Sequence, residues 1–267
     1  MDTATFLHTH RVFTLEDAVK TLAPAGGRNS ALERLKYAVR RGKAKRVARE
    51  VYASIPPGAD PKKFQPDPYL VAASIRSDAV FSHHSALELL GAAHSEWHIC
   101  TVFTRRRRAP LRLGNMELRF MAHPSALGRG RLTSVGTRKV YRLDRPLCVA
   151  GPERTLVDGF REVDLVGGLE ELLESAAGFS VLDLKLLYKI LEAYNEKTLW
   201  AAVGWFLESH KRNFYVDDRR LRKLETRVPK SPHYLLPGER GGTLLRRWNL
   251  IVPQSVAVAG GGNESQL

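Results

Sequence analysis

Residues 28–54 read RNSALERLKYAVRRGKAKRVAREVYAS, a segment of helical period that ends at Gly42 and is followed by two short runs of strand-forming residues. Leu32, Leu35 and Val39 recur at helical spacing and predict a buried stripe. Gly42 is the predicted stop, because glycine readily takes the left-handed conformation that ends helices. Residues 44–47 and 51–54 are then predicted to be the two strands of a basic hairpin.

The start of this helix also has a sequence signal. Asn29 or Ser30 can accept a backbone N–H as the N-cap, and Glu33 can bond back to close a capping box. The side chains that then point away from the predicted stripe are Ser30, Arg34, Tyr37 and Arg41, with Lys36 and Arg40 on the flanks. A hydroxyl, an aromatic ring and arginines together can bind phosphates and base edges in a major groove.

The charge of this stretch favours a polyanion as its partner. From Arg28 to Arg49 there are nine basic residues against one acid, a local net charge of +8. Phosphate contacts from lysine and arginine supply most of the affinity of a protein for duplex DNA. The predicted DNA-binding residues are Arg28, Asn29, Ser30, Arg34, Lys36, Tyr37, Arg40, Arg41, Lys43, Lys45, Arg46 and Arg49.

A second helix precedes the basic one. Thr14 is its predicted N-cap, residues 15–22 carry an apolar face, and Glu16 and Asp17 lie in the first turn, where the helix dipole favours acids. Residues 23–27 make the turn. Helix, turn, basic helix and basic hairpin are the parts of a winged helix-turn-helix. The alternative is an ordinary basic helical subdomain that contacts RNA, the ribosome or a protein.

The totals agree with a protein that binds polyanions. The chain has 267 residues, a formal net charge of +14 and 43% hydrophobic residues, which predicts two globular domains. The sequence has no apolar run of membrane-spanning length and no signal-peptide pattern at its start, so we expect a cytoplasmic protein without a membrane partner. Cys100 and Cys148 are the only cysteines and are expected to be inert core thiols.

Composition along the chain predicts an α+β fold with a winged helix-turn-helix followed by a mixed α/β domain whose carboxy-terminal part is helical. The predicted domains are a DNA-binding domain over residues 1–55, a linker rich in proline over 56–66, an α/β domain over 67–255 and a disordered tail over 256–267. Helices are expected at 67–75, 83–90, 153–160, 169–177, 182–194, 199–209 and 218–224. Strands are expected at 97–103, 116–121, 139–143, 147–149 and 248–253.

Candidates for catalysis are few. His83 and His84 are adjacent and diverge by about 100° on a helix, so they cannot both face one metal ion without further ligands. Asp183 and Lys185 have a nuclease-like spacing inside a helical segment, where their side chains diverge, and Asp217 is a better helix cap than a magnesium ligand. We therefore expect no enzyme activity, no catalytic residues, no metal and no cofactor.

Two further basic stretches have open interpretations. Arg105 to Arg108 are either a solvated loop or an additional phosphate contact. Residues 211–227 contain seven basic residues against three acids.

Several short motifs, in this order, resemble the AbiEi family of antitoxins from AbiE-type toxin–antitoxin and phage-defence operons. Besides the winged helix, they are Val51-Tyr52, Ile55 to Gly58, Asp67 to Ala72, Ser82 to Glu88, Pro152 to Asp158 and Trp248 to Pro253. The resemblance covers the chain from about residue 5 to residue 253. It implies an antitoxin that represses its own operon through repeats in the promoter and neutralises a nucleotidyltransferase-like toxin. The nuclease-like extension of some relatives is not found in this sequence.

Overall fold

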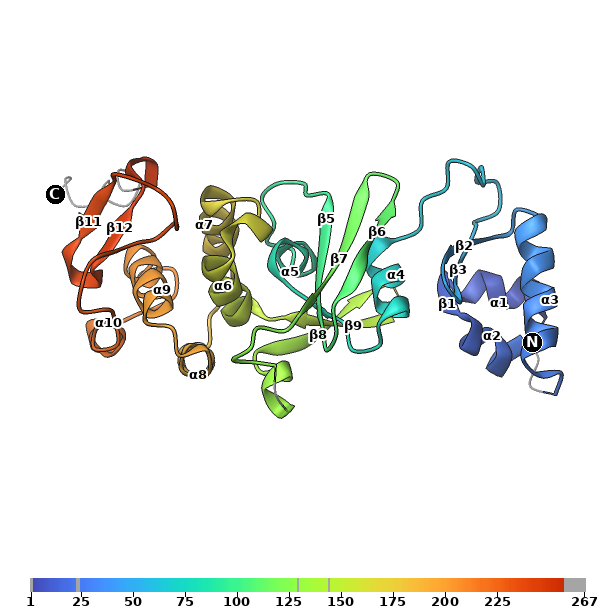
Figure 1. The fold of residues 1–267 in the computed structure, drawn as a ribbon, viewed down its shortest axis with the longest axis horizontal. Helices are drawn as coiled ribbons and strands as arrows, with labels where there is room; N and C mark the ends of the chain where they lie inside the picture. Colours follow the sequence, from blue (N-terminus) through green and yellow to red (C-terminus); the bar gives the residue numbers. More distant parts are fainter. Residues whose placement is uncertain (1, 23–24, 129, 144, 257–267) are drawn as a thin grey trace. The chain divides into compact units, whose positions relative to one another are not determined.

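The computed structural model describes residues 2–22, 25–128, 130–143 and 145–256 and shows an α+β fold (Figure 1). The chain has two compact units. The first unit is Met1–Val80, His98–Ala122 and Tyr141–Leu147, and the second is Phe81–Trp97, His123–Val140 and Cys148–Leu267. The expected domain boundaries at residues 55 and 66 stay a prediction, and the expected tail lies outside the described residues apart from Val256.

The first unit begins with the elements of a winged helix-turn-helix (Figure 1). They are α1 (Thr3–Thr9), β1 (Val12–Thr14), α2 (Leu15–Leu22), α3 (Gly27–Arg40), β2 (Ala44–Ala48) and β3 (Val51–Ser54). The three strands form one antiparallel sheet in the order β1-β3-β2. The predicted helix pair and hairpin are confirmed, whereas α1 and β1 were not expected.

Local hydrogen bonds explain where these elements start. Asp2 caps α1 by accepting the N–H groups of Ala4 and Thr5. Thr14 caps α2 as predicted, since its Oγ1 accepts the Asp17 N–H at 3.1 Å while the Asp17 carboxylate accepts the Thr14 N–H at 2.8 Å. The core beneath them includes Phe6 and Phe13, whose rings meet edge to face at 4.8 Å. Aromatic pairs in this geometry add to the free energy gained by burial alone.

The basic helix α3 differs from the prediction in its start and in its buried face. It begins at Gly27, which has a φ of +63°, and no side chain caps it. The predicted capping box is therefore wrong, and Glu33 pairs with Lys36 instead, at 2.7 Å. The buried side chains are Ala31, Leu35 and Ala38, not Leu32, Leu35 and Val39. Ala31 and Ala38 belong to the core of the winged helix, and Val39 is left 37% exposed.

The remainder of the first unit is a helix and strands of a six-stranded sheet, whose order is β6-β7-β5-β4-β9-β8. It contains α4 (Pro68–Ile75), β5 (Ile99–Thr104), β6 (Arg108–Leu113) and β7 (Met116–Ala122). β5 and β7 are parallel, and β6 is antiparallel to β7. Asp67 caps α4 by accepting the Leu70 N–H, because proline at the first helical position leaves the following N–H groups in need of an acceptor.

The segment 56–66, all of it described, contains no helix or strand and packs against its own unit. A Cβ added to Gly42 would lie 2.9 Å from Pro61 Cγ, and one added to Gly114 would lie 2.9 Å from Gln65 Cδ. Lys45 Nζ also donates to the Phe64 carbonyl at 3.1 Å. These residues therefore touch both the winged helix and the β6–β7 hairpin.

The second unit is predominantly helical, as expected for the carboxy-terminal part (Figure 1). Its helices are α5 (His83–Leu89), α6 (Pro152–Arg161), α7 (Leu169–Ala177), α8 (Leu184–Tyr194), α9 (Lys197–Ser209) and α10 (Asp218–Glu225). A sheet in the order β10-β12-β11 consists of His233–Tyr234, Leu250–Val252 and Thr243–Leu245. Three strands have residues in both units: β4 (Val80–Phe81), β8 (Thr137–Arg142) and β9 (Arg145–Ala150). β4 pairs in parallel with β9 through Phe81 and Val149.

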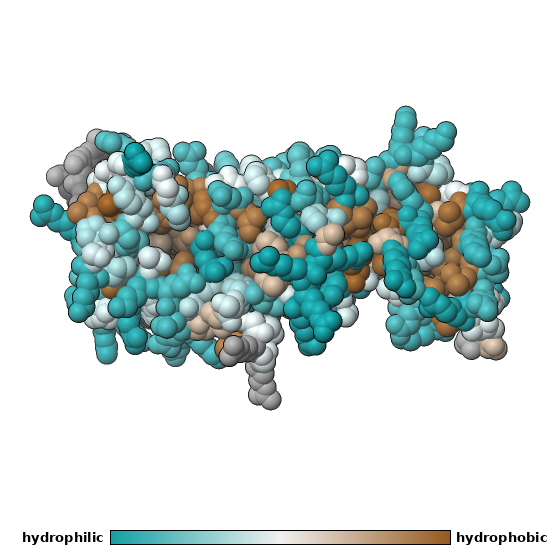
Figure 2. Space-filling view, viewed as in Figure 1, coloured by the Kyte–Doolittle hydropathy of each residue, from teal (hydrophilic) through white to brown (hydrophobic). Residues whose placement is uncertain are grey.

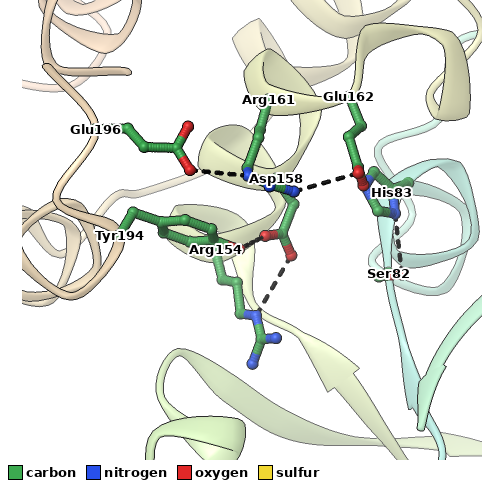
Figure 3. A network of polar contacts seen from close by, with 8 residues as sticks. All are labelled: Ser82, His83, Arg154, Asp158, Arg161, Glu162, Tyr194 and Glu196. Carbon is green, nitrogen blue, oxygen red and sulfur yellow. Dashed lines mark hydrogen bonds and ion pairs between the residues drawn. The ribbon is translucent and has the colours of Figure 1, made fainter. Parts of the chain in front are cut away.

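A buried polar network lies within the core of the second unit (Figure 3). Asp158 on α6 accepts hydrogen bonds from Arg154 Nε and from the hydroxyl of Tyr194 on α8. Arg154 is fully buried, and its Nη1 also donates to the carbonyls of Thr133 and Val135. Because a buried charge is costly unless it is paired and hydrogen-bonded, this network fixes how α6 and α8 pack together.

No helix of the described residues is long and apolar enough to span a bilayer.

Candidate nucleic-acid interface

The predicted DNA-binding residues all lie on α3, on β2 or in the turns that flank β2. Ten of them are exposed, whereas Ser30 and Lys45 are half-buried. The exposed ones are Arg28, Asn29, Arg34, Lys36, Tyr37, Arg40, Arg41, Lys43, Arg46 and Arg49. The face of the molecule drawn in Figure 2 is mostly hydrophilic, with apolar side chains showing between the polar ones.

The observed buried stripe changes which side chains point away from the core. With about 100° per residue, the direction opposite to Ala31, Leu35 and Ala38 is occupied by Asn29, Glu33, Lys36 and Arg40. This outward face differs from the expected one, which had Arg34, Tyr37 and Arg41 at its centre. The difference arises because the buried stripe has Ala31 and Ala38 where Leu32 and Val39 were predicted, one residue earlier at each end.

A groove of about 620 Å³ separates the outward side of α3 from the turn between β2 and β3. Its charged lining contains five cations and two acids, a net charge of +3. The cations are Arg28, Lys36, Arg40, Arg46 and Arg49, and the acids are Glu33 and Glu50. Helix and wing thus place arginine side chains along one cleft, which is the arrangement that holds the backbone of a duplex beside an inserted helix.

Both acids of the groove are paired with its cations. Glu50 Oε1 lies 2.6 Å from Arg28 Nη2, and Glu33 Oε1 lies 2.7 Å from Lys36 Nζ. The hydrogen bond from Lys36 holds the pKa of Glu33 below its usual value. Such exposed pairs contribute little to stability and are readily exchanged, so a phosphate can replace either carboxylate. The sequence signal for the second pair was the three-residue spacing of Glu33 and Lys36.

Arg34, Tyr37 and Arg41 lie on the flank of α3 that faces α1. Arg34 and Tyr37, together with residues of α1, line a second hollow of about 490 Å³. Arg41 Nε donates to the Tyr37 hydroxyl at 3.1 Å, and its guanidinium carbon lies 5.4 Å from the centre of that ring. Tyr37 is 53% exposed, so this pair still presents an aromatic ring and a cation to solvent.

Lys45 has a different environment from the other predicted contacts. Its ammonium group is half-buried and bonded to the Phe64 carbonyl. This side chain therefore tethers residues 56–66 to β2, a contact that the sequence did not indicate.

The other candidate residues take structural positions. Asp183 caps α8 by accepting the N–H groups of Lys185 and Leu186, and Asp217 caps α10. His83 Nε2 lies 3.2 Å from Glu162 and its Nδ1 lies 3.0 Å from the Ser82 hydroxyl (Figure 3). His84 Nε2 lies 3.5 Å from Glu171, and burial lowers the pKa of His84. Among the residues that the structure describes, no group of three or more metal-ligating side chains is found.

Neither the protein-family models nor the curated proteins contain a match to this chain. Among solved structures, the chain is similar to the crystal structure of the RV2827C protein from Mycobacterium tuberculosis. The TM-score is 0.63 and the identity 18%, with 96% of this chain and 91% of that chain covered. This likeness extends over nearly the whole chain and concerns the fold alone.

Proposed function

We propose that the protein is a DNA-binding transcriptional autorepressor and the antitoxin of an AbiE-like toxin–antitoxin operon, in the cytoplasm. The observation that carries the DNA-binding part is the groove between α3 and the wing, with its five cations from two elements. A helix enters the major groove, and the arginines of the adjoining hairpin hold the phosphates beside it. The AbiEi resemblance supports the antitoxin part.

The outward face of α3 supports a particular set of base contacts. Apart from the acid Glu33, Arg40 and Asn29 stand farthest from the buried stripe, and their side chains can form bidentate hydrogen bonds with guanine and adenine respectively. Arg46 and Arg49 of the wing are the phosphate contacts. Arg34, Tyr37 and Arg41 then contact the backbone or bases at the edge of the same site.

DNA binding is tested with the duplex upstream of the operon that encodes the protein and with a shuffled duplex of the same composition. Fluorescence anisotropy over a range of salt concentrations should give tighter binding to the upstream duplex. Replacing Asn29 with alanine should reduce this preference, by about 1 to 3 kcal/mol for a bidentate contact. Equal affinity of the wild-type protein for both duplexes would contradict the repressor assignment.

The toxin part is tested by the adjacent reading frame and by co-expression. The proposal expects a nucleotidyltransferase-like gene next to this one, whose expression alone stops growth and whose effect this protein reverses. Failure of the full-length protein to restore growth would remove the antitoxin assignment and leave the DNA-binding assignment intact.

A further inference from the structure

The basic stretch near the carboxy-terminus forms a second positively charged surface, within the second unit. α10 buries Leu221 and Leu224 against that unit. With about 100° per residue, Arg219, Arg222 and Lys223 point away from these leucines. All three are exposed, and we refer to them as the α10 face.

The acids of this stretch do not cancel its charge at the α10 face. Asp217 accepts the Arg220 N–H at 2.8 Å as the cap of the helix. Glu225 Oε2 lies 3.1 Å from Arg247 Nε, so it is occupied by a cation from outside the stretch. Asp218 is in the first turn, where the helix dipole favours an acid. The net charge over residues 211–227, seven basic side chains against three acidic ones, is +4.

Aromatic rings fix the α10 face onto its neighbours. Lys223 Nζ lies 4.6 Å from the centre of the Tyr188 ring, and the Tyr188 hydroxyl donates to the Arg220 carbonyl at 2.9 Å. Tyr188 in turn stacks on Trp200, with 6.1 Å between ring centres. Lys223 and the backbone of α10 are therefore packed against an aromatic pair, which restricts the Lys223 side chain before a ligand binds.

Tyr215 is an aromatic side chain that the core does not use. It is 85% exposed and has a φ of +52°, in the left-handed region that non-glycine residues seldom adopt. The Arg220 guanidinium holds this backbone by donating to the Tyr215 carbonyl at 3.0 Å. The backbone that carries this exposed ring is thus held near the amino-terminal end of α10.

We propose that Tyr215 and the α10 face bind single-stranded nucleic acid. The three cations contact successive phosphates, and the Tyr215 ring stacks on an unpaired base. A duplex conceals the faces of its bases, so an exposed aromatic side chain next to phosphate-binding cations fits an unpaired strand best. This site is independent of α3 and of the duplex proposed there.

The test uses the full-length protein and fluorescein-labelled single strands of about 12 nucleotides, as RNA and as DNA, within the site sizes of known single-strand binders. Anisotropy is measured over a range of salt for the wild type and for the triple variant Arg219→Gln, Arg222→Gln and Lys223→Gln. The salt slope is the slope of log affinity against log salt concentration. Loss of three phosphate contacts should lower its magnitude by about 2. The matched control replaces Arg138, Lys139 and Lys197 with glutamine, an equal loss of exposed charge. Equal losses of affinity in the two triple variants would overturn the proposal.

The stacking contact is tested separately. Tyr215→Ala should weaken binding of the single strand by about fivefold or more, and Tyr215→Phe should retain it, because a stacked base is worth roughly this much. An unchanged affinity of Tyr215→Ala, or competition by the matching duplex as effective as that by the single strand, would refute it. The Arg40→Gln, Arg46→Gln variant should bind the single strand with wild-type affinity. A failure of the proposed single-strand site can therefore be told apart from a failure of the proposed duplex site. The ratio of the RNA and DNA affinities then identifies the preferred sugar.

Discussion

Replacing Arg40 and Arg46 with glutamine removes one cation from α3 and one from the wing, on opposite sides of the same groove. Both side chains are exposed, and within the described residues the only hydrogen bond that either of them makes is a long one, 3.4 Å from Arg46 Nε to the Ala48 carbonyl. The fold should therefore survive the double substitution. Each lost phosphate contact lowers the magnitude of the salt slope by about 0.9, so the double variant should lose about 1.8.

This slope corresponds to a specific pattern of affinities. If the two proteins bind equally at about 1 M salt, the variant should bind about ninefold more weakly at about 0.3 M and about sixtyfold more weakly at about 0.1 M. Anisotropy with the upstream duplex measures this, and Arg138→Gln with Lys139→Gln on β8 is the control of equal charge. Parallel plots of log affinity against log salt for wild type and variant would refute the assignment of these arginines to phosphates.

Three other changes give separate tests. Glu33→Gln should strengthen duplex binding and raise the slope by about 0.9, because it releases Lys36; an unchanged anisotropy titration would count against the groove. Gly204→Ala should lower the free energy of unfolding by at least about 1 kcal/mol in urea titrations, because its Cβ would lie 2.1 Å from the buried Trp248 ring and overpacking outweighs the gain in helix propensity. Gly159→Ala, which meets a flexible Leu172 methyl, should cost less. The Arg76 hydrogen bond lowers the pKa of Asp78. The stability that this pair contributes is therefore present above about pH 4 and is lost as the pH falls through the lowered pKa. Asp78→Asn should flatten this loss of stability in acid unfolding curves.

The winged helix could be predicted because its signals are local. The threonine cap at Thr14, the apolar spacing of residues 15–22 and the glycine stop at Gly42 each act within one or two turns of chain, and each element appears where it was expected. The first helix, α1, also has a local sequence signal. Asp2 stands three residues before Thr5, and Phe6 and Leu7 supply its buried side.

The orientation of α3 could not be predicted by ranking residues by hydrophobicity. Leu32 and Val39 are larger and more apolar than the alanines beside them, yet the alanines are the buried residues. Close helix packing depends on the surface of the partner helix, and this information is absent from the helix's own sequence. The predicted site residues consequently lie on α3 and the hairpin, as expected, but a different set of side chains is on the outward face of the helix.

Contacts that join distant parts of the sequence were also beyond local patterns. Tyr194 reaches Asp158 across 36 residues, and Glu162 pairs with His83 from another helix (Figure 3). In the sequence, the adjacent positions of His83 and His84 already argued against a shared metal ion. In the structure their side chains meet two different carboxylates, Glu162 and Glu171, so each imidazole holds a different helix to α5.

The pairing of acids distinguishes the two basic surfaces physically. At the groove, Glu33 and Glu50 are bound to groove cations, so a duplex must displace them and the free protein carries its own counter-ions. At the α10 face, Glu225 is paired with Arg247 from elsewhere in the chain, and among the described residues no ion pair engages the outward cations. A ligand of the groove exchanges two weak, exposed ion pairs for its own phosphate contacts, so each displaced acid lowers the net gain from that contact. A ligand of the α10 face displaces no acid from these cations, so its phosphate contacts should retain their full dependence on salt.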